Sequence, residues 1–489
     1  MNGHRQSDGG IVPKKSPNTS QGVEGMEGRP PVKGNASQHP LPWTQSQADG
    51  RLAALERIRQ AVRRKRNDRL TSLYHHIYQV AHLQEAYVAL QRQAAPGVDG
   101  VTWQQYGQDL EANLQDLSKR LARGAYRATA VRRAYIPKPD GRQRPLGVPA
   151  LEDKIVQCVT AWIFSVIWEE EFRGFSYGFR PGRSPHHALD AVMVGIHRKR
   201  VNWILDADIQ GFFDHVSHAW LVRFVEHRIG DMRVIRLIQQ WLTAGVLAEG
   251  GWTPSEEGVP QGGLISPVLA NIYLHYAFDL WAHAWRKRNA HGDVIVVRYA
   301  DDIVLGFEHR AEAGQFQGEL SARLAKFDLT LHADKTRLLE FGRFAVRNFG
   351  RRGQGKPATF DFLGFTHICG QAAQDRFIVR RQTMQKRLRA KLQEIKAELR
   401  RRLHDPIPQQ GRWLRSVLLG HYRYYGVPLN RQALAAFRAQ VMRLWTHALR
   451  RRSQKSRLTR TRRSRLERKW LPVPHIYHPF PWQRLHVTT

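Results

Sequence analysis

Residues 294–307 place two adjacent carboxylates, Asp301 and Asp302, between two runs of β-branched and other apolar residues. The first run reads Val-Ile-Val-Val-Arg-Tyr-Ala and the second reads Ile-Val-Leu-Gly-Phe. Such runs around a short polar stretch are typical of a β-hairpin, so we expect the aspartates at or beside its turn. Neighbouring carboxylates repel each other unless a cation neutralises them. An isolated Asp-Asp pair is usually a solvated turn, but apolar strands on both sides favour a rigid hairpin tip that holds divalent metal.

The chain carries a large excess of positive charge, because 77 Lys and Arg residues stand against 42 Asp and Glu and give a formal net charge of +35. This excess predicts a polyanionic partner rather than a merely solvated cationic surface, and 14 Trp and 14 Tyr offer rings on which bases can stack. The two cysteines, Cys158 and Cys369, lie far apart, which excludes a Cys-based zinc site or a disulfide framework. Without an apolar run of about 18 residues or an apolar signal region, we expect a cytoplasmic protein with no membrane partner.

Composition and periodicity divide the chain into segments at 1–48, 49–192, 193–370, 371–452 and 453–489. The first segment is rich in Gly, Pro, Ser, Asn and Gln and is expected to be disordered, because it cannot bury enough apolar surface to fold. The second combines helical patterns with a hairpin around residues 130–146. The third alternates helices and strands, and the fourth is helical and very basic. The fifth is a basic tail; beyond Asp405 the only carboxylate is Glu467.

A second acidic stretch lies in the third segment. The elements expected there are a strand at 203–209, helices at 221–247 and 266–288, the Asp301-Asp302 hairpin, a helix at 311–327, and strands at 336–341 and 360–365. The first of these strands carries Asp206 and Asp208, and Asp214 follows shortly after it. Mg²⁺ prefers hard oxygen ligands, so a magnesium site needs carboxylates that converge from separate elements. This strand therefore predicts the other edge of a metal site.

Residues 299–302 and 208–214 resemble the metal-binding motifs of reverse transcriptases, and of bacterial group II intron-encoded proteins in particular. The resemblance implies two bound Mg²⁺ ions, for which Mn²⁺ can substitute, and nucleotidyl transfer between them. The implied metal ligands are Asp208, the Ile209 carbonyl, Asp301 and Asp302. Asp208 is selected because the family frame begins there, and neither Asp206 nor Asp214 is excluded. The family usually has Lys where this chain has Gln210, which removes one positive charge near the site.

Further motifs follow in family order from about residue 96 to residue 365. Residues 136–147 resemble the fingers hairpin, whose Lys and Arg suit a triphosphate because Arg offers a fork and Lys a point charge. Residues 258–271 resemble motif B, in which glycines let the backbone approach base and sugar. The implied nucleotide-binding residues are Lys138, Arg144, Phe213 and Gln261. Together these motifs resemble those of the family, and their shared order along the chain identifies the family more specifically than any single motif does.

Two assignments rest on the resemblance alone. In the family, an aromatic ring at the position of Phe213 blocks a ribose 2′-hydroxyl and so selects deoxynucleotides; the alternative is that Phe213 is an ordinary core residue. Lys335 corresponds to a lysine proposed to protonate the leaving pyrophosphate, and it joins the three aspartates as an implied catalytic residue.

Contacts with RNA are expected in several basic segments. Residues 178–184 match a family segment along the template, and residues 413–425 resemble a thumb, or maturase, helix, although its tyrosines can equally be core packing. The cationic run from residue 450 to residue 469 predicts an anionic partner. The implied RNA-binding residues are Arg180, Arg183, Arg415, Tyr422, Arg423, Arg450, Arg451 and Arg452. His475 and His478, in a closing segment that also resembles intron-encoded proteins, have no Cys or acidic companion that would favour zinc.

Taken together, the resemblance implies an α+β right-hand polymerase with fingers, an antiparallel palm sheet, a helical thumb or maturase domain and a disordered N-terminal tail. In this interpretation 49–192 is the N-terminal extension and fingers, 193–370 the palm, 371–452 the thumb helices, and 453–489 a nucleic-acid-binding tail.

The implied function is that of an RNA-directed DNA polymerase and maturase, which assists splicing of its group II intron RNA and copies it during retrohoming. Its partners would be intron RNA, a DNA target and primer, and dNTPs, with association with the nucleoid through the DNA target; the sequence leaves the oligomeric state open. We expect no HNH endonuclease, as in the lineage called class C. The alternatives are a splicing cofactor with a vestigial polymerase site and a domesticated or defence-associated reverse transcriptase.

Overall fold

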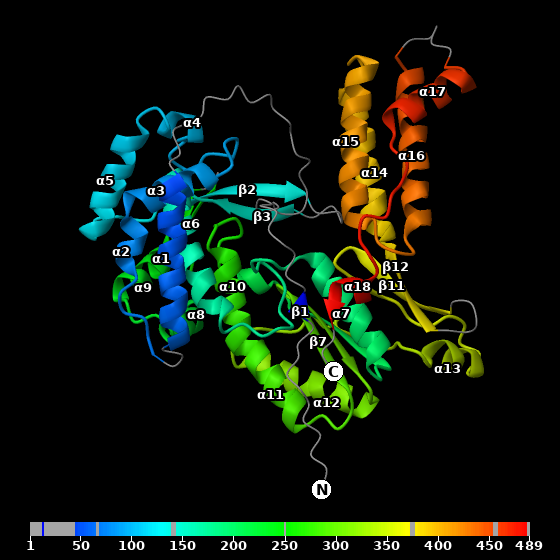
Figure 1. Ribbon diagram of the computed structural model, residues 1–489, viewed down its shortest axis with the longest axis horizontal. Helices are drawn as coiled ribbons and strands as arrows, with labels where there is room; N and C mark the ends of the chain where they lie inside the picture. Colours follow the sequence, from blue (N-terminus) through cyan, green and yellow to red (C-terminus); the bar gives the residue numbers. More distant parts are fainter. Residues whose placement is uncertain are drawn as a thin grey trace.

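The computed structural model describes residues 12–13, 45–64, 68–137, 143–248, 251–371, 377–452 and 458–486. The segment expected to be disordered, residues 1–48, lies mostly outside this part. Within it, the structure describes only β1 (Val12–Pro13), which pairs with β13 (Leu485–His486), and the start of α1 at Gln45. Figure 1 shows a helical body on the left, a sheet with its helices below the centre, and an upright helix bundle on the right.

The helical body is built from the N-terminal helices. These are α1 (Gln45–Arg64), α2 (Tyr74–Tyr78), α3 (Val80–Ala89), α4 (Trp103–Tyr106), α5 (Leu110–Ala122) and α6 (Leu151–Glu169). Helix α6 forms the centre of this body because apolar residues surround most of its circumference, and Ile155, Phe164 and Trp168 are fully buried. A hairpin of β2 (Val131–Pro137) and β3 (Gln143–Val148) projects from the body, as the sequence predicts.

Strands β4 (Trp203–Asp208), β7 (Val294–Tyr299), β8 (Asp302–Phe307) and β9 (Arg337–Glu340) form the palm sheet, in the order β7-β8-β4-β9. Every neighbouring pair in it is antiparallel, which confirms the expected fold class. Both faces are covered, because adjacent residues such as Ile204 and Leu205 point into different hydrophobic cores. Helix α7 (Pro185–Arg198) covers one face, and α10 (Ser266–Leu274), a π-helical turn (His275–Asp279), α11 (Leu280–Arg288) and α12 (Arg310–Ala325) line the other.

The expected single helix at 221–247 is wrong. The chain forms α8 (His218–Glu226) and α9 (Met232–Thr243), followed by a hairpin of β5 (Val246–Ala248) and β6 (Gly251–Thr253) beside β2. Helix α9 begins anew because the Asp231 carboxylate caps its first turn, accepting from Arg233 N, and also accepts from the backbone N–H groups of Leu73 and Tyr74. A tertiary contact with the N-terminal body therefore divides the segment.

The expected strand at 360–365 is also divided. Leu363 (φ 47°) and Gly364 (φ 82°) turn the chain between β10 (Phe360–Phe362) and β11 (Phe365–Gln371). Strand β12 (Phe377–Thr383) completes a three-stranded sheet. Helix α13 (Ala345–Arg351), which precedes these strands in the chain, packs against β11.

Among the described residues, no helix has both the length and the apolar character that crossing a membrane requires.

The thumb bundle consists of α14 (Gln385–Arg401), α15 (Ile407–Tyr425), α16 (Arg431–Arg450) and α17 (Arg460–Trp470). It has its own hydrophobic core, drawn from these helices and Leu471, in which Trp445 is fully buried and donates from Nε1 to Gln410 Oε1 at 2.9 Å. The chain then runs back through α18 (Pro481–Arg484) to the palm.

Replacing Trp445 with alanine should destabilise the thumb by about 3–5 kcal/mol, because it leaves a cavity and removes the donor to Gln410 Oε1. Since the thumb has a separate core, backbone hydrogen exchange should accelerate in α15 and α16 much more than in β4 and β8. Trp252→Ala is the matched control because that ring is 58% exposed. Uniform acceleration across thumb and palm would show that the two cores unfold as one unit.

Candidate active site

The two aspartates of the opening hairpin lie where the sequence predicts them. Ala300 and Asp301 form the turn between β7 and β8, and Asp302 is the first residue of β8. Ala300 adopts a left-handed conformation (φ 56°), which is costly for a residue with a Cβ. Asp302 is paired with Tyr299 on one side and with Asp208 on the other. The antiparallel register thus brings the Asp301-Asp302 turn and the end of β4 together.

Two carboxylates of this site, Asp302 and Asp206, have a raised pKa. The Asp302 side chain is reached by solvent, yet surrounding protein limits its hydration, and this together with the charges of Asp301, Asp208 and Asp206 raises its pKa to about 7. Repulsion from the neighbouring carboxylates by itself raises the pKa of Asp302, even though water reaches its side chain. Asp206 lies two residues before Asp208, on the same face of β4; burial raises its pKa to about 6, with Asp208 adding to the shift and Arg337 opposing it.

Basic side chains occupy part of this acidic cluster. Lys335 Nζ donates to Asp208 Oδ2 at 2.8 Å, and Arg337 Nη2 donates to Asp206 Oδ2 at 3.2 Å. In the described part of the chain, no three His, Cys, Asp or Glu side chains are arranged as a ready metal centre. The donor set nevertheless fits Mg²⁺, because it consists of hard carboxylate oxygens from two strands and a turn. Asp208, Asp301 and Asp302 would hold the metal once Lys335 released Asp208.

A buried arginine that sequence reasoning did not identify holds the hairpin turn. Arg298, fully buried in β7, donates from Nε and Nη2 to the Asp279 carboxylate at 2.7 and 2.5 Å. Its other donors reach Asn271 Oδ1 (3.0 Å), the Ala300 carbonyl (3.0 Å) and Ser176 Oγ (2.8 Å). All five N–H donors of the guanidinium are therefore used. A lone Arg inside an otherwise apolar strand was the signal in the sequence, but its partners lie far away along the chain.

The same network fixes the chain on the other side of the turn. Asn271 Nδ2 donates to the Gly178 carbonyl at 2.7 Å. A Cβ on Gly178 would lie 2.3 Å from Ala300 N, so only glycine lets this segment approach the turn. Burial alone would raise the pKa of Asp279, but the Arg298 charge and hydrogen bonds from Arg298 and His275 hold it below its usual value. Asp279 thus stays ionised and neutralises Arg298.

The loops after β4 and before α10 form a second layer of the site. A 3₁₀ turn at Phe212–Asp214 follows β4, and Val259 N donates to the Phe213 carbonyl at 2.8 Å. Gln261 Nε2 donates to Asp214 Oδ1 at 3.2 Å, while Gly147 N in β3 donates to the Gln261 carbonyl at 2.8 Å. The structure therefore brings Phe213 and Gln261 together with the base of the β2–β3 hairpin. Phe213 is partly buried and packs against the hydrophobic core, and its role as a sugar gate or as a core residue stays a prediction.

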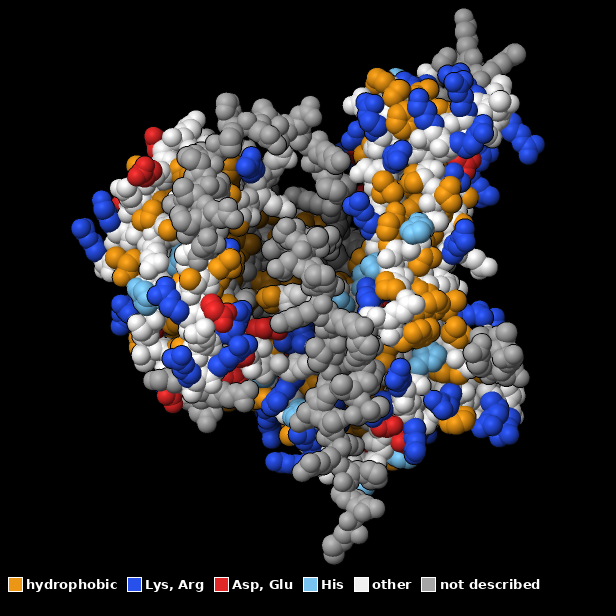
Figure 2. Space-filling model, viewed as in Figure 1, with side chains coloured by type: hydrophobic (Ala, Val, Ile, Leu, Met, Phe, Trp, Pro, Cys, Tyr) orange, Lys and Arg blue, Asp and Glu red, His pale blue; other side chains and the backbone are white. Residues whose placement is uncertain are grey.

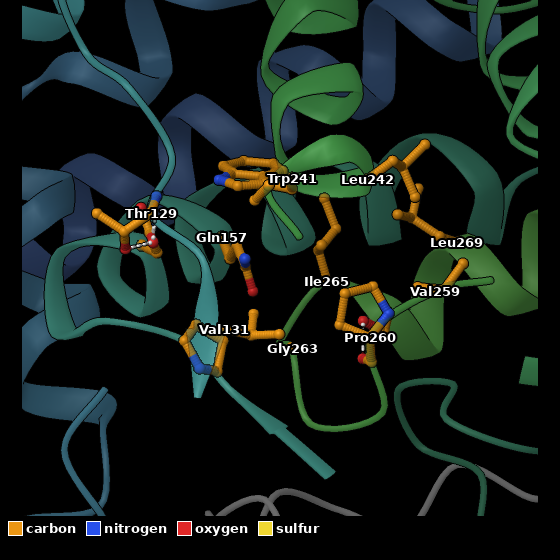
Figure 3. Close-up of a pocket in the computed structure, with 14 residues that line it drawn as sticks. Thr129, Val131, Gln157, Trp241, Leu242, Val259, Pro260, Gly263, Ile265 and Leu269 are labelled. Atoms are coloured by element: carbon orange, nitrogen blue, oxygen red, sulfur yellow. Dashed lines mark hydrogen bonds between the residues drawn. The ribbon is translucent and has the colours of Figure 1, made fainter. Parts of the chain in front are cut away.

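A pocket lies behind the motif B loop (Figure 3). Gln157, from α6, points toward Gly263, and its Oε1 accepts from Leu264 N at 3.0 Å. Ser266 Oγ donates to the Pro260 carbonyl at 2.8 Å and closes the loop on itself. None of the site aspartates lines this pocket, so it is a support for the loop rather than the place of the chemistry.

The phosphate clamp expected from the fingers hairpin falls outside what the structure describes. Lys138 is not among the described residues, and Arg144 lies in β3 opposite Ile136 with its side chain undescribed. Both assignments stay predictions.

The expected RNA-binding residues divide into an internal and an exposed group. Arg180 is 5% exposed and donates to both oxygens of Glu169, and Arg183 donates to the Gly174 carbonyl. Tyr422 is fully buried and donates to the Pro472 carbonyl at 3.2 Å. RNA contact by these three stays untested, but the geometry gives them internal roles. The exposed members are Arg415, Arg423, Arg450 and Arg451; Arg452, partly exposed, donates to the His404 carbonyl.

With converging carboxylates, a hairpin turn and a separate helical thumb, the fold and site are those of a template-copying nucleotidyltransferase. The family model described as "Reverse transcriptase (RNA-dependent DNA polymerase)" matches residues 136–367, from β2 to β11. The chain belongs to this reverse transcriptase family. This confirms the resemblance on which the sequence interpretation rests and the enzyme class that goes with it.

Similar proteins include Protein YkfC of Escherichia coli K12, which is 36% identical over 281 residues, covering 50% of this chain and 72% of YkfC. The group II intron-encoded protein LtrA of Lactococcus lactis is 34% identical over 225 residues, 46% of this chain and 37% of LtrA. Nuclear intron maturase 4 of Arabidopsis thaliana mitochondria is 29% identical over 136 residues, 28% of this chain and 17% of that protein. The chain thus matches less than two fifths of LtrA.

The variant Asp279→Asn should lower the stability of the palm by about 3–5 kcal/mol, because it leaves the Arg298 charge buried and uncompensated. Thermal unfolding followed by circular dichroism measures the loss. The double variant Asp279→Leu with Arg298→Met should recover much of the stability, because neither charge remains. It should not recover primer extension, because nothing then holds the Ala300 carbonyl. Wild-type melting of Asp279→Asn would contradict the role given to this ion pair.

Proposed function

We propose that this protein is an active RNA-directed DNA polymerase that works by two-metal nucleotidyl transfer. The observation that carries the proposal is the register of the palm sheet, which pairs Asp208 with Asp302 beside the Asp301-Asp302 turn. This crowding of carboxylates, in which burial and neighbouring charges raise the pKa of Asp302, is costly to stability unless a cation is to be bound there. Bound Mg²⁺, with Mn²⁺ as substitute, would activate the primer 3′-hydroxyl and hold the triphosphate.

The chain's own residues have distinct tasks in this proposal. Asp208, Asp301 and Asp302 bind the metal, with the Ile209 carbonyl beside it. Lys335 bonds to Asp208 in the structure and lies at the edge of the site, with its side chain 53% exposed. It is therefore placed to leave Asp208 when metal binds and to donate its proton to the departing pyrophosphate.

Substrate selection is assigned to the second layer of the site. Phe213 would exclude a 2′-hydroxyl, and Gln261 would contact the nascent base pair, held by its link to Asp214. Lys138 and Arg144 would bind the triphosphate. In each case the support is the convergence of the loops around the end of β4.

A maturase role rests on the basic thumb. Figure 2 shows Lys and Arg side chains distributed over the upright helix bundle, and the molecule is hollowed between this bundle and the helical body. Helix α17 has no buried residue, and its exposed cations have few carboxylates to neutralise them. A surface of this kind attracts the phosphates of folded RNA. Similar proteins include a group II intron-encoded protein and an intron maturase. The partners and the process that we propose on this basis are intron RNA, a DNA target with its primer, and retrohoming in the cell.

The variant Asp302→Asn should reduce primer extension on an RNA template by at least about a thousandfold, because one metal ligand loses its charge. Asp328→Asn is the matched control, since Asp328 is exposed on the same domain and its φ of 56° suits asparagine. The same Asp302 variant should still promote intron splicing at low Mg²⁺, which depends on RNA binding. If extension survives the substitution, the catalytic assignment is wrong; if the wild type promotes splicing without ever extending a primer, the vestigial-polymerase alternative is correct.

Removing the Phe213 ring should relax sugar selection. Phe213→Ala should raise the relative kcat/KM for ribonucleotides over deoxynucleotides by about 10- to 100-fold, because a steric block of about 1–3 kcal/mol is lost. Single-nucleotide insertion of dCTP and CTP on the same primer measures the ratio, and the deoxynucleotide rate serves as the internal control. An unchanged ratio would return Phe213 to the role of a core residue.

A further inference from the structure

The C-terminal strap, residues 471–484, runs back along the thumb toward the palm after α17 (Figure 1). Its first part lies against α15 and α16. Arg438 donates to the Leu471 carbonyl at 3.1 Å, and Tyr422 Oη donates to the Pro472 carbonyl at 3.2 Å. Farther along, the backbone N–H groups of Tyr477 and His478 donate to the Gly426 carbonyl at 2.8 and 3.0 Å. The strap is thus bonded along the thumb to the end of α15.

The strap packs directly against the α15 backbone. A Cβ on Gly411 would lie 2.4 Å from the ring of Trp470, the last residue of α17, which immediately precedes the strap. A Cβ on Gly426 would lie 2.9 Å from the His475 carbonyl. Glycine at both positions therefore permits an approach that no other residue allows.

The second part of the strap binds the palm helix α7. Arg484 Nη2 lies 2.5 Å from Asp190 Oδ2, and Arg381 Nη1 of β12 donates to Asp190 Oδ1 at 2.7 Å. Asp190 is fully buried, so its charge depends on these two arginines. The His478 ring stacks on His186 of α7 with 3.6 Å between ring centroids.

The ring nitrogens of His478 bond α15 on one side and Arg484 of the strap on the other. Its Nε2 donates to the Arg423 carbonyl of α15 at 2.6 Å, since a carbonyl can only accept. Its Nδ1 then accepts from Arg484 Nη1 at 3.2 Å. Burial lowers the pKa of His186 and His478, so the stacked rings are neutral and do not repel each other. One imidazole therefore links thumb helix, palm helix and the terminal arginine.

From these contacts we propose that the C-terminal strap fixes the thumb over the palm, with Arg484 and His478 as positioning residues. The thumb's other contacts with the palm gather at its base, where Asn430 bonds Thr383 of β12 and Tyr424 donates to the Leu363 carbonyl at 2.9 Å. Val427 joins the palm's buried apolar cluster there, and the Tyr424 ring lies 5.1 Å from His186 of α7. Contacts at one joint leave a helix bundle free to swing, whereas an attachment to α7 on a second element resists rotation. Resting on the proposed polymerase function, the inference is that the strap keeps the thumb closed on the template–primer duplex between successive additions.

The test separates the chemical step from the grip on the duplex. Arg484→Ala should shorten products made in one binding encounter, with heparin as trap, by about threefold or more, because a thumb that opens releases the duplex sooner. The rate of adding one nucleotide should stay within about twofold of wild type, since Arg484 is remote from the carboxylates. Arg484→Lys should restore part of the product length, because it keeps the charge opposite Asp190. Gln483→Ala, which changes the exposed neighbour in α18, should behave as wild type.

Hydrogen exchange gives a measurement that does not depend on activity. In Arg484→Ala, the amides of α7 and of the end of α15 should exchange faster, while those of β4 and β8 should not change. If Arg484→Ala changes neither hydrogen exchange nor product length, the proposed role of the strap is wrong. It is also wrong if the variant loses product length and single-nucleotide rate to the same extent. If wild-type protein does not extend primers at all, the polymerase proposal fails, and the exchange result alone decides for or against the strap.

Discussion

The structure depends most on one buried guanidinium. Arg298 lies inside the palm sheet, where an uncompensated charge would be prohibitive, and all its donors are satisfied by groups from four parts of the chain. Because the guanidinium is planar and its donors have fixed directions, it specifies how α10, the Asp279 turn and the segment before α7 sit around the β7–β8 turn. The strained Ala300 conformation persists because this network overdetermines it. The position of the Asp301-Asp302 pair is therefore a consequence of packing behind it.

In front of the turn, electrostatics works against stability. Asp206, Asp208, Asp301 and Asp302 are gathered at one end of the sheet, and their repulsion is only partly offset by Lys335 and Arg337. A binding site for divalent metal requires this arrangement, since ligands that were fully neutralised by the protein would not bind an ion. The rigid sheet and the Arg298 network behind it supply the stability that the acidic front loses. Both halves of this balance lie within the one four-stranded sheet.

In the thumb, the core and the surface have different roles. Its own core makes it a separate folding unit, and its outward face is left to exposed cations. A bundle with a separate core has to be oriented by other contacts. The short polar joint at Thr383 and Asn430 and the strap at Asp190 provide these, and both use groups that are buried when paired. The position of the thumb is thus encoded in these polar pairs together with a small apolar contact at its base, where Val427 joins the buried cluster that contains Phe365.

Much of this protein follows from the sequence alone. The period of the apolar residues predicts the hairpin, the strand before Asp208 and the thumb helices, and motif order predicts the family, because local pattern and short motifs are legible along the chain. Tertiary contacts decided the rest. Asp231 caps α9 locally and is held there by distant backbone N–H groups, Arg180 and Tyr422 turn inward, and Arg298 and Asp190 find partners far along the chain. Whether a basic or aromatic side chain faces solvent or protein depends on which distant segment packs beside it, and a one-dimensional pattern does not contain that neighbour.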